Sequence, residues 1–243
     1  SNLSFDIIEA MAKLRGEASL VGGHITVIAG NHDDAAVSFL MGISLNHNVT
    51  PLQFCAHPEN KCIGITEFRD FLEDDQKKEI NQDNPETWFE LKTYRKQILE
   101  KMRKDPLGKQ ILEHMCSMNL VTTVDDSLFL HTNPTANIMD NLLDGVANRA
   151  QLDERIASIN TRYQTGLRRV LFDGVDIDDP TFIQFKSTFL DTDNRTDFTL
   201  AETAIALRKC GINAIFHGHT ITNDGNEITR NQGLLTVKTD RGA

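Results

Sequence analysis

The chain has little cysteine, no long hydrophobic run and no excess of basic residues, and each shortage excludes something. Four cysteines in 243 residues make no obvious disulfide framework, which indicates a reducing, cytoplasmic environment. No apolar run approaches the roughly 20 residues that a membrane-spanning helix needs. The formal net charge of -10 argues against nucleic acid as a partner, because phosphate backbones are bound by clustered Lys and Arg.

What is present is typical of a globular α/β protein. The composition is 40% hydrophobic and 25% charged, which suits one large domain or one domain with an insertion. Short β-branched runs alternate with amphipathic helical stretches along the chain. The predicted fold is α/β: a mixed sheet, in a sandwich of two packed sheets flanked by helices, with an inserted helical subdomain.

The hydrophobic periodicity predicts most of the elements. A helix is expected over 5–14, with a stop at Arg15-Gly16, and a helix over 34–41 is expected to begin with Asp33 or Asp34 as its N-cap. A long helical region should follow over 136–167, and Gly211 should end a further helix. The predicted strands cover 25–29, 120–124, 128–130, 214–216 and 234–238.

The stretch 46–118 has a different character, since it is polar, helical in pattern and without strand signals. We expect it to form the inserted helical subdomain. Its longest apolar stripe has near-heptad spacing and is either part of the intramolecular core or a surface for a protein partner. The stripe consists of Trp88, Leu91, Arg95, Ile98, Leu99 and Met102.

Three polar motifs each follow a predicted strand. They are Gly30-Asn31-His32-Asp33, then His131, then Gly218-His219-Thr220. Residues at strand ends can converge while the strands hold them in place, which is how α/β sheets build sites. Imidazole nitrogen and amide oxygen suit borderline divalent metals such as Mn, Fe or Zn. The pattern therefore predicts a metal site.

These motifs, in this order, resemble those of the calcineurin-like metallophosphoesterases, and more narrowly the phosphoprotein phosphatase branch. The resemblance covers most of the chain outside 46–118. It implies that Asn31, His131 and His219 bind the second of two divalent metals and that His32 is the general acid. It also implies that Arg195, in the segment 194–199, clamps the substrate phosphate.

Three further positions bear on the resemblance. Ile221 stands where many phosphodiesterases of the family carry another metal-binding histidine, as is typical of the phosphatase branch. Asp33 and His217 are expected to support the ligands from outside the metal's own shell, although His217 could equally lie in the core.

The chain also departs from the family pattern. The Asp-x-His and Gly-Asp-x-x-Asp-Arg-Gly motifs that hold the first metal are not found, and we expect them upstream of Ser1. Residues 1–243 would then be an N-terminally incomplete metallophosphoesterase domain. His131 is followed by Thr132-Asn133 instead of two glycines, and Ala29 precedes Gly30 where an arginine is common.

The expected function is a metal-dependent phosphomonoesterase that hydrolyses phosphoproteins, on Ser/Thr or Tyr, with a metal-activated water and a proton from His32. Two alternatives stay open. One is a binding or regulatory module that keeps the phosphatase fold without catalysis, and the other is a hydrolase of dinucleotides or other small phosphate esters. A secreted bacterial effector that acts inside a host cell is the alternative to a cytoplasmic protein.

Overall fold

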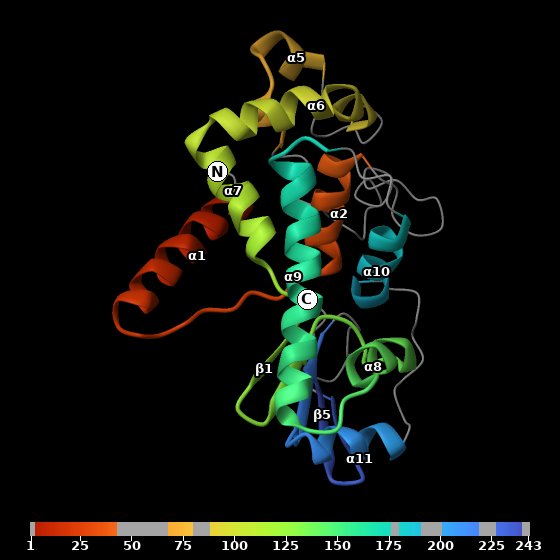
Figure 1. Ribbon diagram of the computed structural model, residues 1–243. Helices are drawn as coiled ribbons and strands as arrows, with labels where there is room; N and C mark the ends of the chain where they lie inside the picture. The colour runs from red at the N-terminus through yellow and green to blue at the C-terminus, as the bar shows by residue number, and fades with distance from the viewer. Residues whose placement is uncertain are drawn as a thin grey trace. The chain divides into compact units, whose positions relative to one another are not determined.

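The computed structural model describes residues 3–42, 68–79, 88–175, 180–190, 201–218 and 227–239, without the side chains of 3–5, 32, 79 and 88–92. The chain divides into two compact units, and each is described by itself (Figure 1). The helical unit comprises Ser1–Ile25, His32–Ser117 and Thr165–Asp178. The sheet unit comprises Thr26–Asn31, Met118–Gln164 and Asp179–Ala243.

The sheet unit is built on a mixed five-stranded sheet, which makes the fold α/β as predicted. The strand order is β1-β2-β3-β5-β4. The three central strands run parallel to one another, and each edge strand pairs antiparallel with its neighbour. The strands are β1 (Val121–Val124), β2 (Ser127–Leu130), β3 (Ala214–His217), β4 (Glu227–Asn231) and β5 (Leu234–Lys238).

The register of β2 and β3 sets the core of this sheet. Phe129 pairs with Phe216, and the two rings stack with their centroids 4.9 Å apart. Leu128 pairs with Ile215, and both side chains are fully buried. Because side chains alternate between the two faces of a strand, the aromatic pair and the aliphatic pair lie on opposite faces of the sheet.

The helices of the sheet unit begin and end at recognisable capping residues. Thr135 caps α8 (Ala136–Leu143) by accepting a hydrogen bond from the amide of Ile138. Gly145, at φ 70°, separates α8 from α9 (Arg149–Leu171), so the long helical region predicted over 136–167 is two helices. The remaining helices are α10 (Pro180–Leu190) and α11 (Ala201–Lys209), and Gly211 follows α11 at φ 77° as predicted.

Asn160 fastens α9 to the start of the sheet. Its Oδ1 accepts from the amides of Leu120, at 2.9 Å, and Val121, at 3.4 Å, and its Nδ2 donates to the carbonyl oxygen of Val121 at 2.7 Å. The side chain is buried, so these bonds satisfy polar groups that water cannot reach. One amide side chain therefore sets how α9 lies against β1.

The described elements of the helical unit are all helices. The buried faces of α6 and α7 form much of its core, through Ile98, Met102, Ile111 and Leu112. The described part of the predicted apolar stripe is therefore core, whereas the side chains of Trp88 and Leu91 are not described. The elements are α1 (Leu3–Leu20), α2 (Asn31–Met41, its first residue in the sheet unit), η2 (Phe68–Phe71), α5 (Asp74–Glu79), α6 (Trp88–Lys104) and α7 (Pro106–Ser117).

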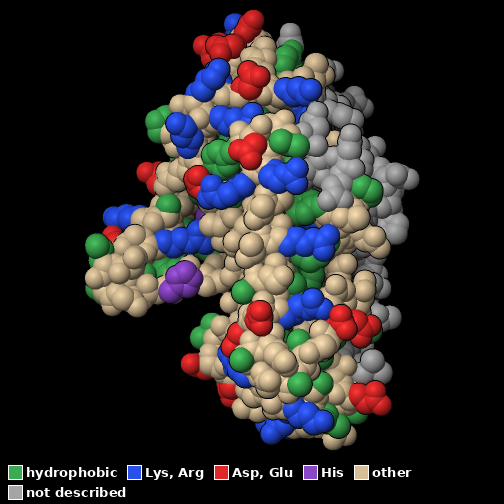
Figure 2. Space-filling model, viewed as in Figure 1, with side chains coloured by type: hydrophobic (Ala, Val, Ile, Leu, Met, Phe, Trp, Pro, Cys, Tyr) green, Lys and Arg blue, Asp and Glu red, His purple; other side chains and the backbone are tan. Residues whose placement is uncertain are grey.

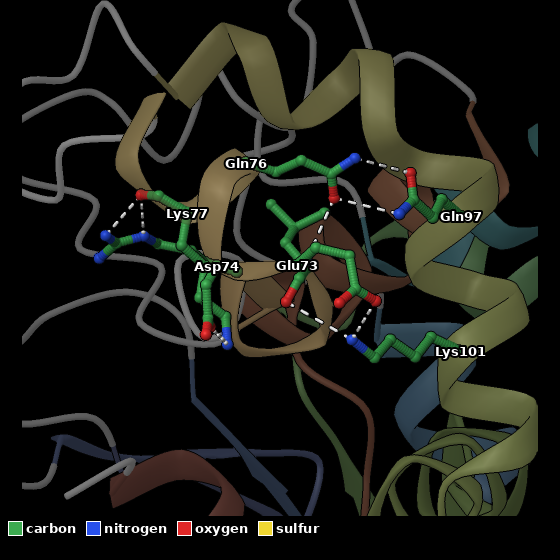
Figure 3. A network of polar contacts seen from close by, with 8 residues as sticks. Glu73, Asp74, Gln76, Lys77, Gln97 and Lys101 are labelled. Carbon is green, nitrogen blue, oxygen red and sulfur yellow. Dashed lines mark hydrogen bonds and ion pairs between the residues drawn. The ribbon is translucent and has the colours of Figure 1, made fainter.

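A network of polar contacts joins the start of α5 to α6 (Figure 3). The amides of Gln76 and Gln97 bond to each other in both directions, at 3.0 and 3.2 Å. Lys101 reaches the carboxylate of Glu73 at 3.0 Å. Glu73 is exposed and the other three side chains are partly exposed, so the ion pair adds little to the free energy of unfolding.

Two expectations about the first helices are wrong. The helix predicted to stop at Arg15-Gly16 continues to Leu20, because an isolated glycine costs less than the helix gains from four further residues, and Gly22 at φ 74° follows it. The second helix begins at Asn31, so Asp33 lies within its first turn and not at its N-cap. A carboxylate there still stabilises the positive end of the helix dipole.

Three expectations about the sheet and its helices also change. The predicted strand at 25–29 forms a single parallel bridge, between Ile28 and Asn119, and no longer ladder. Neither strand β4 nor helix α10, at Pro180–Leu190, was among the predicted elements. The described residues form one sheet, so the second sheet and the bounds of the inserted subdomain stay predictions.

No helix within the described ranges is long and apolar enough to cross a membrane. Side chains of both charge signs are interspersed with hydrophobic ones on the face drawn in Figure 2.

Gly108 provides the first test of this packing. A Cβ at this buried position of α7 would come within 2.5 Å of the Cα and carbonyl oxygen of Met102 on α6. We therefore expect Gly108→Ala to lower the free energy of unfolding by about 1 to 3 kcal/mol, measured by urea denaturation. The matched control is Gly16→Ala in exposed α1, where no atom lies within 4 Å and a gain of about 0.5 to 1 kcal/mol is expected. Equal effects at the two sites would contradict the close helix contact.

His114 provides a test by pH. It lies on α7 where Arg15 of α1 donates to Ser117 Oγ, and burial, with a smaller effect of the Arg15 charge, lowers the pKa of His114 to about 4. The unfolded chain takes up this proton near pH 6.5, so stability is lost as the pH falls from 6.5 towards 4. After allowance for solvent screening, we expect a loss of roughly 1 kcal/mol between pH 7 and pH 5.

The measurement compares urea midpoints of the wild type and His114→Gln at both pH values. The His114→Gln protein should lack this part of the pH dependence, whereas His24→Gln, at an exposed histidine, should keep it. An unchanged slope in His114→Gln would show that other groups carry the effect.

Candidate functional site

The backbone of 26–31 brings Asn31 to the start of the sheet. The carbonyl oxygen of Val27 accepts from the amide of Asn119 at 2.9 Å, and the amide of Ala29 donates to the carbonyl oxygen of Asn119 at 2.8 Å. Asn119 precedes β1 by two residues, and the chain bends at Leu120, which limits the pairing to this one bridge. Asn31 follows as the first residue of α2.

The ends of β2 and β3 deliver the other two motifs to one edge of the sheet. His131 comes directly after Leu130, the last residue of β2, and Gly218 comes directly after His217, the last residue of β3. The amide of Gly218 donates to the carbonyl oxygen of His131 at 2.9 Å. Because β2 and β3 are parallel, their carboxyl ends meet at the same edge.

Asn31 and His131, which are 100 residues apart in the sequence, contact each other through their side chains. His131 Nε2 lies 2.8 Å from Asn31 Oδ1 in a partly buried position. An amide oxygen can only accept a hydrogen bond, so Nε2 carries the proton and donates it. The structure therefore brings together two of the three predicted metal ligands.

The two residues after His131 are buried polar side chains, a feature that the sequence reasoning missed. Thr132 is 3% exposed, and its Oγ1 donates to the carbonyl oxygen of Phe189 on α10 at 3.2 Å. Asn133 is 4% exposed. This chain therefore has two buried polar side chains directly after His131, at the positions where the family pattern has two glycines. The sequence signal for this feature was the presence of polar residues between the end of a predicted strand and Thr135, the N-cap of α8.

The other predicted site residues are placed as follows. His217 ends β3 with 2% of its surface exposed, and its carbonyl oxygen accepts from the amide of Thr239 at 2.8 Å. Asp33 lies exposed in the first turn of α2. His32 is the second residue of α2, but its side chain lies outside the described residues, as do His219 and Arg195.

The described donors do not by themselves make up a metal site. Within the described part of the chain, no three His, Cys, Asp or Glu side chains gather in a way that could hold a metal ion. The pair at the sheet edge consists of one imidazole and one amide oxygen. The third predicted ligand, His219, lies outside the described residues.

Comparison with known proteins yields a distant structural likeness. No family model matches the chain, and no curated protein matches it. The chain is similar to the crystal structure of a cold-active protein-tyrosine phosphatase of a psychrophilic Shewanella species, with a TM-score of 0.47 and 15% sequence identity. The likeness covers 97% of this chain and 55% of that one, so the chain spans about half the length of that phosphatase. A likeness this distant assigns neither a family nor an activity.

The bond between His131 and Asn31 predicts the tautomer of the metal-free histidine. We expect a long-range ¹H–¹⁵N spectrum of the protein, after treatment with EDTA, to show His131 protonated at Nε2, because Asn31 Oδ1 accepts that proton. Asn31→Ala should reduce the population of this tautomer, whereas the signals of exposed His24 should stay unchanged. A spectrum with the His131 proton on Nδ1 alone would contradict the geometry.

Proposed function

We propose that the protein is a metal-dependent phosphatase whose site lies at the edge of the sheet where β2 and β3 end. The observation that carries the proposal is the 2.8 Å contact between His131 Nε2 and Asn31 Oδ1. These two residues were selected from the sequence as ligands of one metal, on motifs 100 residues apart. Their meeting supports the phosphatase resemblance, because unrelated polar residues would have no reason to share one point.

The pair fits a divalent cation of the Mn, Fe or Zn type. Neutral imidazole and amide oxygen are both acceptable ligands of such metals. Two neighbouring ligands, each roughly 2.1 Å from one cation, are about 3 Å apart, close to the separation of the two atoms in the hydrogen bond. Binding would require loss of the Nε2 proton, since a histidine ligand must be deprotonated at the ligating nitrogen. Bound divalent metals would supply Lewis-acid polarisation of the phosphate ester and a nucleophilic water.

The remaining roles are assigned from the sequence. His219 follows Gly218, the residue bonded to His131, and is proposed as the third ligand. His32, beside Asn31 in the chain, is proposed to protonate the leaving oxygen, and Arg195 to clamp two phosphate oxygens with its planar guanidinium. Ligands of the other metal would come from upstream of Ser1. The proposed substrate is a phosphoprotein, with a small phosphate ester as the alternative within the same chemistry.

The activity test uses p-nitrophenyl phosphate with and without Mn²⁺, on the chain printed here and on a longer product of the same gene that extends upstream of Ser1. We expect metal-dependent hydrolysis by at least the longer protein. His32→Ala should lower kcat by roughly 10²- to 10⁴-fold, the usual loss when a general acid is removed. Asn31→Ala and His131→Ala should each raise the Mn²⁺ concentration for half-maximal activity by at least roughly tenfold.

His24→Ala is the control, because it removes an exposed histidine outside the site. Two outcomes would reject the proposal. Hydrolysis that is unaffected by EDTA would exclude the metal, and hydrolysis that survives both ligand variants would exclude the site. Absence of turnover in the longer protein, with Mn²⁺ binding retained, would instead favour a non-catalytic module of the same fold.

A further inference from the structure

The sheet unit contains a hollow that is formed by helices and shares no residue with the site at the strand ends. It has a volume of about 590 Å³ and is lined by residues of α8, α9 and α11. Figure 1 shows α8 and α11 near each other, and the two helices are in contact. Pockets that bind small-molecule ligands have volumes of this order, roughly 300 to 1,000 Å³.

The charges in the hollow are unbalanced. Asp140 and Asp144 come from the end of α8, and Glu202 comes from the first turn of α11. Arg155, on α9, is the single cation among the described residues that line it. The carboxylates therefore exceed the cation by two charges.

Arg155 already forms an ion pair with one of these carboxylates. Its Nη2 lies 3.1 Å from Asp144 Oδ2 and 3.4 Å from the carbonyl oxygen of Asp144. Among the described residues, no hydrogen bond or ion pair is made by the side-chain carboxylate of Asp140 or Glu202. The negative charge that faces the open hollow thus comes from Asp140 and Glu202.

The remaining walls suit a long side chain with an apolar stem. Met139 of α8 is buried and lines the hollow, and Leu143 and Ala206 add further apolar surface. Thr203 supplies a hydroxyl acceptor beside Glu202. An arginine side chain matches this combination, because its methylene stem packs on apolar walls while its guanidinium donates to several oxygens at once.

We propose that this hollow binds an arginine side chain of a partner polypeptide, between Asp140 and Glu202. The proposal is independent of the hydrolase site, since it uses none of its residues. Charge complementarity favours a basic partner segment. The net charge of -10 on the whole chain would further favour the approach of such a segment.

The experiment titrates the ¹⁵N-labelled protein with acetyl-Leu-Arg-Leu-amide at low ionic strength and follows backbone amide shifts by NMR. The matched ligand is the same peptide with citrulline in place of arginine, which keeps the shape and removes the charge. We expect saturable shifts at the amides of Asn141 and Thr203 with the arginine peptide and none with the citrulline peptide. Binding should weaken when salt is added to about 0.5 M, because the Debye length falls to a few ångströms, towards the roughly 3 Å reached at 1 M, and charge attraction is screened.

Isosteric variants test the two carboxylates. Asp140→Asn and Glu202→Gln should each weaken peptide binding by about fivefold, and the double variant should abolish the shifts. Glu154→Gln removes an exposed carboxylate of α9 outside the hollow and should leave binding unchanged. Thermal unfolding of each variant shows that the fold is kept, which is expected for changes at exposed side chains.

Three results would overturn the proposal: equal binding of the citrulline peptide, shifts confined to other parts of the protein, or unchanged binding by the double variant. Spermidine is titrated in parallel. Tighter binding of spermidine than of the arginine peptide at the same amides would replace the polypeptide partner with a free polyamine and would also overturn it.

Discussion

The parallel pairing of β2 and β3 is the constraint on which the candidate site depends. It fixes Phe129 against Phe216 on one face and Leu128 against Ile215 on the other, so neither strand can slip by one residue without exchanging its two faces. Because the register is fixed, His131 and Gly218 leave the sheet side by side, and their backbones are joined by a hydrogen bond. Asn31 then meets a histidine whose backbone is already held.

The regular elements were largely predictable because their signals are local. The hairpin around Asp125 and the helix ended by Gly211 each carry a turn residue next to a clear hydrophobic pattern. Strand β4 has no hydrophobic pattern: it is polar, it lies at the sheet edge, and four of its five residues are exposed. The signal for its pairing with β5 is the two-residue turn Gln232-Gly233, at φ 48° and 80°, which joins the two strands as a hairpin. The break between α8 and α9 falls at Gly145. A glycine alone does not predict a break, because glycine also occurs inside helices, as Gly16 does in α1.

For the candidate site, the choice of residues could be predicted from the sequence, but the contacts around them could not. Residue type and position after a strand were enough to select Asn31 and His131, because parallel strands bring their carboxyl ends together. The contacts that hold the site were not predictable. Thr132 bonds to a backbone carbonyl of α10, a helix that the sequence did not reveal, and Asn160 bonds to the backbone carbonyl of Val121, the first residue of β1, 39 residues away in the sequence. Both are side chains bonded to backbone groups, and a backbone carbonyl has no sequence signature.

The choice of asparagine at position 31 has an electrostatic consequence for the same site. A carboxylate at 2.8 Å from His131 Nε2 would stabilise the charged imidazolium and raise the pKa of the histidine. A protonated histidine cannot bind a metal, so the cation would have to compete with that proton. The neutral amide accepts the proton of Nε2 without favouring the imidazolium, and its oxygen can still serve as a ligand. The neutral pair thus orients His131 without adding a negative charge beside its ring, and it leaves an amide oxygen next to the imidazole nitrogen.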